Sequence, residues 1–274
     1  MALNRACLGR LYTGAPIEVT DDELRGFIEA LRESPTSWRD RNGAALAHPA
    51  FPFKLVRTVM PQLLDDPELG VNRQRMVHGE QGFTYHQPIR AGELITVKAE
   101  IVGIEDKPTG QVLRTEQRMY SGDALAVTGV AVAFIRGDQA KPATATTREP
   151  RPPAPERLQL RRATRDVDAA LARRYAEASG DHNPIHLDEA AARNAGLGGI
   201  ILHGACTLAL AMSELARGAG ASHQLQQVFA RFVRPVRLPN QLEIAIWDEA
   251  SGVGFEVRTG DGELVLGAGN ALLG

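Results

Sequence analysis

The sequence predicts an α+β protein made of two similar halves, each with helices followed by an antiparallel sheet. In both halves, helical spacing of apolar residues precedes several consecutive segments in which apolar and polar residues alternate. Helices followed by runs of strands, and not alternating with them, are typical of this fold class. Between the halves, residues 137–163 hold five of the sixteen prolines, which favours a semi-extended linker. We therefore expect an N-terminal domain over residues 1–136 and a C-terminal domain over 164–274.

The first half begins with a predicted helix over residues 20–33. Thr20 followed by Glu23 is a capping box, and the apolar residues after it keep helical spacing. A second, more buried helix is expected over residues 53–60. Four strands follow, separated by turns that contain glycine, over residues 75–86, 93–102, 111–120 and 125–135.

The second half repeats this order. A helix is expected over residues 165–178, where Gly180 is placed to end it. A short helix over 187–195 and a buried helix over 205–216 come next. The remaining predicted strands cover residues 227–233, 242–248, 252–259 and 264–272.

A short phrase also recurs in the two halves. Pro88-Ile-Arg-Ala-Gly precedes an apolar strand, and Pro235-Val-Arg-Leu-Pro does the same 147 residues later. With the shared order of elements, this match predicts an internal duplication of one long helix wrapped by an antiparallel sheet. Such halves pair as the two subunits of a symmetric homodimer do.

Composition narrows the function classes. A net charge of −2 gives no general reason to expect nucleic acid or an anionic membrane as a partner. Apolar runs stay short of the roughly 20 residues of a membrane span, and the first residues lack the apolar core of a secretory signal. Only Cys7 and Cys206 could form a disulfide, so a soluble protein of the reducing cytoplasm is expected.

The chemistry is concentrated in residues 178–207. Asp181 and His186 lie on either side of Asn183-Pro184, and such a turn can direct both side chains into one cleft. A carboxylate and an imidazole at hydrogen-bond distance from one proton are suited to general acid–base catalysis. The alternative is that Asp181 only caps a turn and His186 only starts a helix, because Gly-Asp-x-Asn-Pro is good turn chemistry by itself.

His203-Gly204 follows an apolar run and precedes the predicted buried helix. Unpaired N–H groups at a helix N-terminus can stabilise a developing oxyanion, and glycine lets a ligand approach them. The alternative is that Gly204 serves a tight corner and that His203 is a structural, hydrogen-bonded histidine.

Two other interpretations use the same region, and a third concerns arginines further along the chain. A metal site could take Asp181, His182, His186 and His203, but the proline prevents the two nearby histidines from sharing a regular helical face. Cys206 could be a nucleophile, although its small-residue helix favours a buried, inert thiol. Arg231 and Arg234 could contact substrate phosphates, or they could form a solvated strand face.

Three motifs of the second half can be taken together: Tyr175-Ala-Glu-Ala-Ser-Gly-Asp-His-Asn-Pro-Ile-His-Leu-Asp, Ile201-Leu-His-Gly-Ala-Cys-Thr and Arg231-Phe-Val-Arg-Pro-Val. They resemble the MaoC-like dehydratase family, whose best-known members are the (R)-specific enoyl-CoA hydratases, or hydratase 2. Val77-His-Gly-Glu-Gln and Tyr85-His-Gln-Pro-Ile-Arg-Ala-Gly resemble the non-catalytic N-terminal domain of its duplicated members. The resemblance implies a double hot-dog fold.

The resemblance also implies a site. Asp181 and His186 would hold the catalytic water with support from Asn183, and the N–H of Gly204 would bind the thioester oxygen. His203, Arg231 and Arg234 are assigned to substrate binding. The first half has no matching Asp–His pair, so we expect one active site per chain and acyl-chain space in the N-terminal half.

The implied reaction is reversible hydration of a trans-2-enoyl thioester to an (R)-3-hydroxyacyl thioester, with no metal and no cofactor. The substrate would be carried by CoA or by acyl carrier protein, and the expected assembly is a homodimer of double hot dogs. A hot-dog thioesterase, a hydratase of dicarboxylic (mesaconyl-type) thioesters and a non-catalytic acyl-thioester binding protein are the alternatives.

Overall fold

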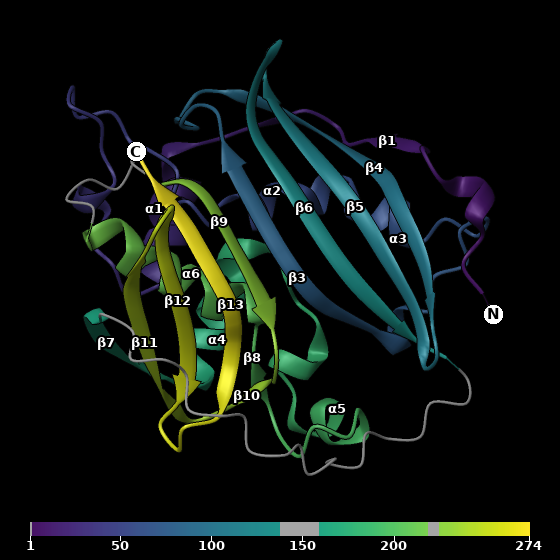
Figure 1. Cartoon of the computed structure of the whole chain (residues 1–274). Coiled ribbons are helices and arrows are strands. Elements are labelled where there is room, and N and C mark those ends of the chain that lie inside the picture. Colours follow the sequence, from purple (N-terminus) through teal and green to yellow (C-terminus); the bar gives the residue numbers. More distant parts are fainter. Residues whose placement is uncertain (1, 138–158, 219–224) are drawn as a thin grey trace.

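The computed structural model describes residues 2–137, 159–218 and 225–274. Its strands form an antiparallel eleven-stranded sheet with helices gathered on one face, and two further short strands pair separately (Figure 1). The strands of the first half are β1 (Leu11–Thr13), β2 (Ile17–Glu18), β3 (Met76–Tyr85), β4 (Leu94–Lys107), β5 (Gly110–Ser121) and β6 (Ala124–Arg136). Those of the second half are β7 (Gln159–Val167), β8 (Ile201–Leu202), β9 (Leu225–Phe232), β10 (Val236–Arg237), β11 (Asn240–Glu249), β12 (Gly252–Thr259) and β13 (Leu264–Leu273).

The two halves join into one sheet through β3 and β9. The strand order is β1-β4-β5-β6-β3-β9-β13-β12-β11-β7, so each half occupies one side of that joint. The two central strands run antiparallel, with Glu80 opposite Arg231 and Thr84 opposite Gln227. An antiparallel pair at the centre is what an approximate two-fold axis between duplicated halves produces. This is the predicted double hot-dog fold.

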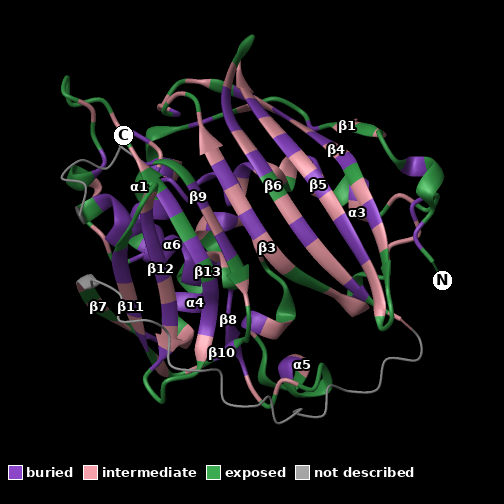
Figure 2. Ribbon diagram, in the orientation of Figure 1, coloured by how far each residue is buried: buried purple, intermediate pink, exposed green. Residues whose placement is uncertain are grey.

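The principal helix of the second half is α6 (Gly204–Gly218), preceded by α4 (Ala169–Ser179) and the short α5 (Glu189–Asn194). The residues of α6 from Cys206 to Ala216 are buried under the sheet, and Figure 2 shows the strands over them alternating between buried and more exposed residues. In the first half, α1 (Asp21–Ala30) has the predicted capping box of Thr20 and Glu23.

The expected long central helix of the first half is not continuous. The segment is divided into α2 (Pro52–Leu55), the 3-10 turn η3 (Val56–Thr58) and α3 (Met60–Leu64). Val59 leaves helical geometry at φ −122°, and Pro61 occupies the first turn of α3, where proline is tolerated because that N–H needs no helical partner. The predicted helix over residues 53–60 is therefore wrong as a single element.

The boundary between the halves also needs correction. Residues 159–163, assigned to the linker, belong to β7, and so do residues 165–167, assigned to a helix. The strand pairs with β11, and α4 begins only after Asp168, whose side chain accepts the N–H of Leu171. The rest of the predicted linker, residues 138–158, lies outside the described residues. The division into domains at this linker stays a prediction.

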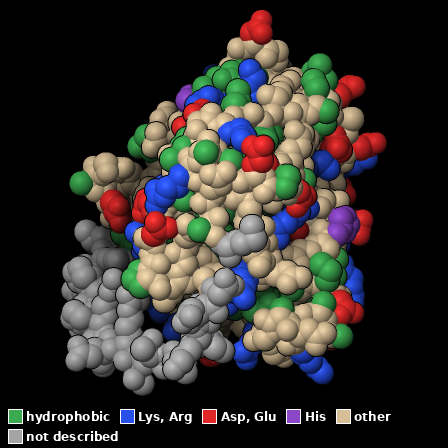
Figure 3. Space-filling model, turned by 90° about the vertical axis from the view of Figure 1, so that its right-hand side faces the viewer, with side chains coloured by type: hydrophobic (Ala, Val, Ile, Leu, Met, Phe, Trp, Pro, Cys, Tyr) green, Lys and Arg blue, Asp and Glu red, His purple; other side chains and the backbone are tan. Residues whose placement is uncertain are grey.

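Basic and acidic side chains are interspersed on the face drawn in Figure 3. No helix in the described ranges has the length and apolar character needed to cross a membrane.

Candidate active site

The turn after α4 sets the geometry of the site. Gly180 ends the helix at φ +73°, a left-handed conformation that favours glycine. Ser179 Oγ then accepts the N–H of Asp181 at 3.2 Å. Asn183 is exposed and caps the 3-10 turn η5 (Pro184–His186), its Oδ1 accepting the N–H of Ile185 at 3.4 Å. The turn places His186 in the interior, where it is buried.

Asp181, His186 and His203 form one cluster. One carboxylate or ring atom from each lies within 4.8 Å of the others, and the two imidazoles stack at 3.8 Å with an interplanar angle of 28°. His203 reaches the pair from the end of β8, because its Nε2 bonds the backbone oxygen of Asp181 at 2.9 Å. The structure thus brings together three residues that the sequence singled out.

Backbone partners determine which ring nitrogens carry protons. His186 Nδ1 lies 2.9 Å from the carbonyl oxygen of Ile201, and a carbonyl can only accept. Nδ1 of His186 and Nε2 of His203 are therefore the donors when the rings are neutral, which leaves His186 Nε2 and His203 Nδ1 as acceptors. His203 Nδ1 is buried and has no hydrogen-bond partner within the described residues.

Burial keeps both imidazoles neutral. It lowers the pKa of His186, although the Ile201 carbonyl and the charge of Asp181 act in the opposite direction. Burial, followed by the neighbouring His186, lowers the pKa of His203 to about 4. At neutral pH the cluster therefore offers a carboxylate and two uncharged proton acceptors.

The N-terminus of α6 adjoins this cluster. Thr207 donates the first helical hydrogen bond to the carbonyl of His203 at 3.0 Å, so the N–H groups of Gly204 and the two residues after it precede the helical ladder. A Cβ on Gly204 would lie 3.1 Å from the ring of Phe232. Glycine is thus required for a close approach here, and the exposed backbone fits an oxyanion site.

The geometry does not favour a metal ion. A zinc ion lies about 2.0–2.1 Å from an imidazole nitrogen and in the plane of the ring. The rings of His186 and His203 are stacked at 3.8 Å with an interplanar angle of 28°, so an ion in the plane of one ring at that distance would lie out of the plane of the other. His182, also considered as a ligand, is half exposed and lies beside Glu177 at 3.8 Å.

Two residues of the first half that the sequence analysis did not assign to the site lie near it, and one of them, His78, belongs to the Val77-His-Gly-Glu-Gln motif. Arg57 Nη1 lies 3.4 Å from Asp181 Oδ1. The ring of His78, on β3, lies 4.7 Å from that of Phe232. His78 is accessible to solvent, yet desolvation lowers its pKa, and the charge of Asp181 partly opposes that shift. His78 therefore lies on the accessible side of Phe232.

The two arginines assigned to substrate lie differently. Arg231 binds Glu80 across the β3–β9 joint, with Nη2 2.7 Å from Oε1. Adjacent strand residues point to opposite faces of a sheet, so Arg231 faces away from the cluster that Phe232 adjoins. This orientation does not support the assignment of Arg231 to substrate binding, which stays a prediction. Arg234, beyond the end of β9, is exposed and lies 4.0 Å from Glu263.

Comparison with known proteins identifies the family. A model of the MaoC-like domain matches residues 151–267, and one of the FAS1-like dehydratase region matches residues 6–129. A UPF0336 protein of Streptomyces coelicolor is 36% identical over 121 residues, covering 41% of this chain and 81% of that protein. The chain belongs to the MaoC-like dehydratase family.

Two further matches cover more of this MaoC-like chain. Mouse peroxisomal multifunctional enzyme type 2 is 32% identical over 219 residues, which cover 73% of this chain and 28% of that protein. The crystal structure of a MaoC-like dehydratase from Phytophthora capsici superposes with a TM-score of 0.79, covering 98% of this chain and 96% of that one. Its identity is 22%, so it supports the fold alone.

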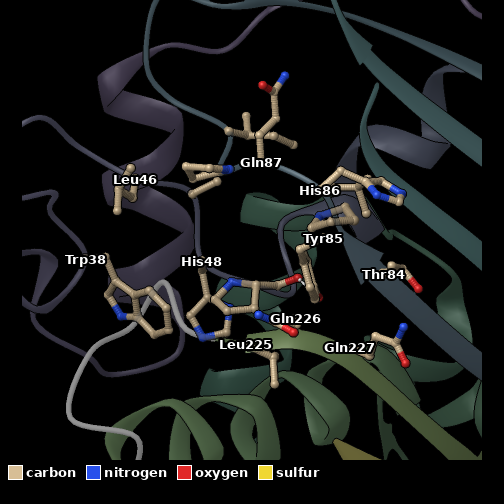
Figure 4. A pocket seen from close by; sticks show the side chains of 16 residues that line it. Trp38, Leu46, His48, Thr84, Tyr85, His86, Gln87, Leu225, Gln226 and Gln227 are labelled. Atoms are coloured by element: carbon tan, nitrogen blue, oxygen red, sulfur yellow. Dashed lines mark hydrogen bonds between the residues drawn. The ribbon is translucent and has the colours of Figure 1, made fainter. Parts of the chain in front are cut away.

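A cavity of about 340 Å³ marks the equivalent place in the first half of this MaoC-like chain (Figure 4). It lies where β3 ends and β9 begins, whereas Phe232 and His78 lie at the other end of that strand pair. The sequence around it, His48-Pro49-Ala50, parallels His203-Gly204-Ala205.

The cavity lacks the chemistry of its counterpart. Pro49 has no N–H where Gly204 has one. His48 is fully engaged: Nδ1 accepts the N–H of Ala50 at 3.0 Å, and Nε2 lies 2.9 Å from Ser213 Oγ. Burial lowers the pKa of His48 to about 3. The described residues that line the cavity include no aspartate, and one active site per chain stays a prediction.

Buried aromatic rings lie between this cavity and the Asp–His cluster and separate the two. Tyr175 lies 5.2 Å from His203, Phe27 lies 5.7 Å from Tyr175, and His48 lies 5.9 Å from Phe27. The cavity is therefore a separate hollow and not a continuation of the cluster.

Proposed function

We propose that the protein is a hydro-lyase that reversibly hydrates trans-2-enoyl-CoA to (R)-3-hydroxyacyl-CoA. The observation that carries this proposal is the Asp181, His186 and His203 cluster beside the N-terminus of α6. Membership of the MaoC-like dehydratase family supports it. The likeness to a multifunctional peroxisomal enzyme supports action on an acyl thioester.

The tautomer of His186 suggests how the proton moves. His186 Nε2 takes a proton from water as the water oxygen bonds to C3 of the enoyl thioester, and the double-bond electrons move to the carbonyl oxygen. The N–H of Gly204 stabilises that enolate oxygen. The imidazolium then delivers its Nε2 proton to C2, which restores the carbonyl and the neutral histidine.

In this scheme the proton added to C2 comes from the attacking water. Both Asp181, as a carboxylate, and neutral His186 begin as acceptors, and the other proton of His186 is bound to the Ile201 carbonyl. Asp181 then orients the water, and Asn183 steadies its turn through an N–H to Oδ1 contact of 3.4 Å. The chain needs no metal or cofactor for these steps.

Loss of either catalytic side chain tests the proposal. Asp181→Asn and His186→Ala should lower crotonyl-CoA hydration by about 10²–10⁴-fold, the usual effect of removing a positioned acid or base. His182→Ala is the matched control, because His182 adjoins Asp181 in sequence but is exposed and outside the cluster. Unchanged hydration in both site variants would rule out this mechanism.

The same assay separates the alternatives. A thioesterase would release free CoA thiol without loss of the conjugated double bond, and a binding protein would show ligand-induced stabilisation without turnover. Cys206 gives the thioesterase no support, because it is fully buried and burial raises the pKa of its thiol. A panel of enoyl-CoA chain lengths with one dicarboxylic member defines the substrate. Acyl carrier protein as carrier, a homodimer and a cytoplasmic location stay predictions.

A further inference from the structure

Arg57 belongs to the half of the chain that lacks the Asp–His pair, yet its guanidinium lies beside Asp181. Its Nη1 is 3.4 Å from Asp181 Oδ1. The neighbouring Lys54 donates from Nζ to the carbonyl of Ala178 at 3.2 Å, which fixes the segment against the end of α4. A Cβ on Gly180 would lie 3.6 Å from Arg57 Cδ, so the arginine stem packs against the turn that carries Asp181.

We infer that Arg57 is a positioning residue of the active site, which fixes the carboxylate of Asp181 for its water. Both the guanidinium and the N–H of Asn183 contact Oδ1. Among the described residues, no protein donor contacts Oδ2, so that oxygen is left for water. This inference rests on the proposed function.

A cation is needed here because the substrate changes the environment of Asp181. The side chain of Asp181 is 30% exposed in the free protein, and an acyl thioester over the cluster would displace the water around it. A carboxylate that loses its water without gaining an opposite charge is strongly disfavoured. Arg57 supplies that charge and leaves the acceptor nitrogen of His186 free. The broken central helix of the first half thus has a function, since η3 carries this arginine.

A merely structural role makes a different prediction. The side chain of Arg57 is 42% exposed, and ion pairs this accessible contribute little to stability. Its replacement should therefore affect turnover much more than folding. Fixing a catalytic group affects the chemical step more than substrate binding, so kcat should change and KM should not.

The test compares Arg57→Gln, Arg57→Lys and Arg73→Gln in crotonyl-CoA hydration. Arg73 is the matched control, because it belongs to the same half and pairs with Asp65 at 2.8 Å with its side chain 50% exposed. Arg57→Gln should lower kcat by about 10–100-fold, the range expected for a misplaced catalytic group. KM should stay within about threefold and Arg57→Lys should recover most of the loss. Turnover equal to that of Arg73→Gln, or a change confined to KM, would overturn the inference.

A second measurement does not depend on turnover. The charge of Arg57 is one of the lesser causes that lower the pKa of His203 to about 4, after burial and His186. Long-range proton–nitrogen NMR of the imidazoles should show that pKa rising in Arg57→Gln and unchanged in Arg73→Gln. An unchanged His203 in Arg57→Gln would overturn the placement of Arg57. Absence of hydration by the wild-type protein would instead overturn the proposed function.

Discussion

Replacing Gly204 with alanine tests whether the N-terminus of α6 binds the thioester oxygen. The added Cβ would lie 3.1 Å from Cδ1 and Cε1 of Phe232, whereas carbon atoms in good contact are about 3.5–4.0 Å apart. The ring must therefore move by several tenths of an ångström. The ring of His78 lies 4.7 Å from that of Phe232 and limits how far the latter can move. The methyl group would add bulk two bonds from the backbone nitrogen of residue 204 and hinder the approach of a thioester oxygen to its N–H.

The expected loss of turnover is about 10²–10³-fold, equivalent to about 2.7–4 kcal/mol, as for removal of one oxyanion donor. The free energy of unfolding should change little, because the helix preference of alanine over glycine, up to about 1 kcal/mol, is offset by the displacement of the Phe232 ring. The assay is initial-rate hydration of crotonyl-CoA together with urea unfolding of the same preparation.

The matched control for this variant is Gly26→Ala in α1. A Cβ at Gly26 would have no heavy atom within 4 Å, so this variant should gain about 1 kcal/mol of stability and keep full turnover. A folded Gly204→Ala protein with wild-type turnover would refute the role assigned to the helix N-terminus.

Further predictions concern a histidine, a cysteine and an arginine. His48 has a pKa of about 3 when folded and about 6.5 when unfolded. Between these values the unfolded chain binds the extra proton, so the free energy of unfolding falls as pH is lowered, by up to about 1.4 kcal/mol per pH unit. His48→Gln should lose less stability than wild type between about pH 6.5 and 4.5 in urea denaturation, and equal losses would count against this reasoning. Cys206→Ala should keep its turnover, because Cys206 is buried and burial raises the pKa of its thiol; an inactive but folded variant would restore the nucleophile interpretation. Arg231→Ala should leave kcat and KM within about twofold in the hydration assay, because Arg231 binds Glu80 on the face away from Phe232, and a large rise in KM would contradict that orientation.

Patterns among neighbouring residues in the sequence were sufficient to predict much of the secondary structure and the turn at the site. The capping box of Thr20 and Glu23 starts α1 as predicted, and strands of period two appear where alternation predicted them. The turn between Asp181 and His186 could be recognised because its glycine, asparagine and proline restrict the backbone over a few residues. The pairing of the two side chains across that turn follows from the same local geometry.

Local signals failed where an element depends on distant partners. Residues 165–167 have no strong preference of their own and become strand because β7 pairs with β11. The helix expected over residues 53–60 is interrupted instead, and the interruption places Arg57 beside Asp181. No sequence pattern near Arg57 predicts its contact with Asp181.

The sequence by itself determined most of the helices and strands, the duplication, and the Asp181, His186 and Gly204 motif, because these depend on residues close together in the chain. Tertiary structure alone decided that Arg231 would face away and that Arg57 and His78 would come from the other half. Those outcomes depend on the joint between β3 and β9 and on the contact of η3 with the end of α4. Such contacts join segments more than 100 residues apart, where the packing of the whole fold, and not the preference of neighbouring residues, determines what meets.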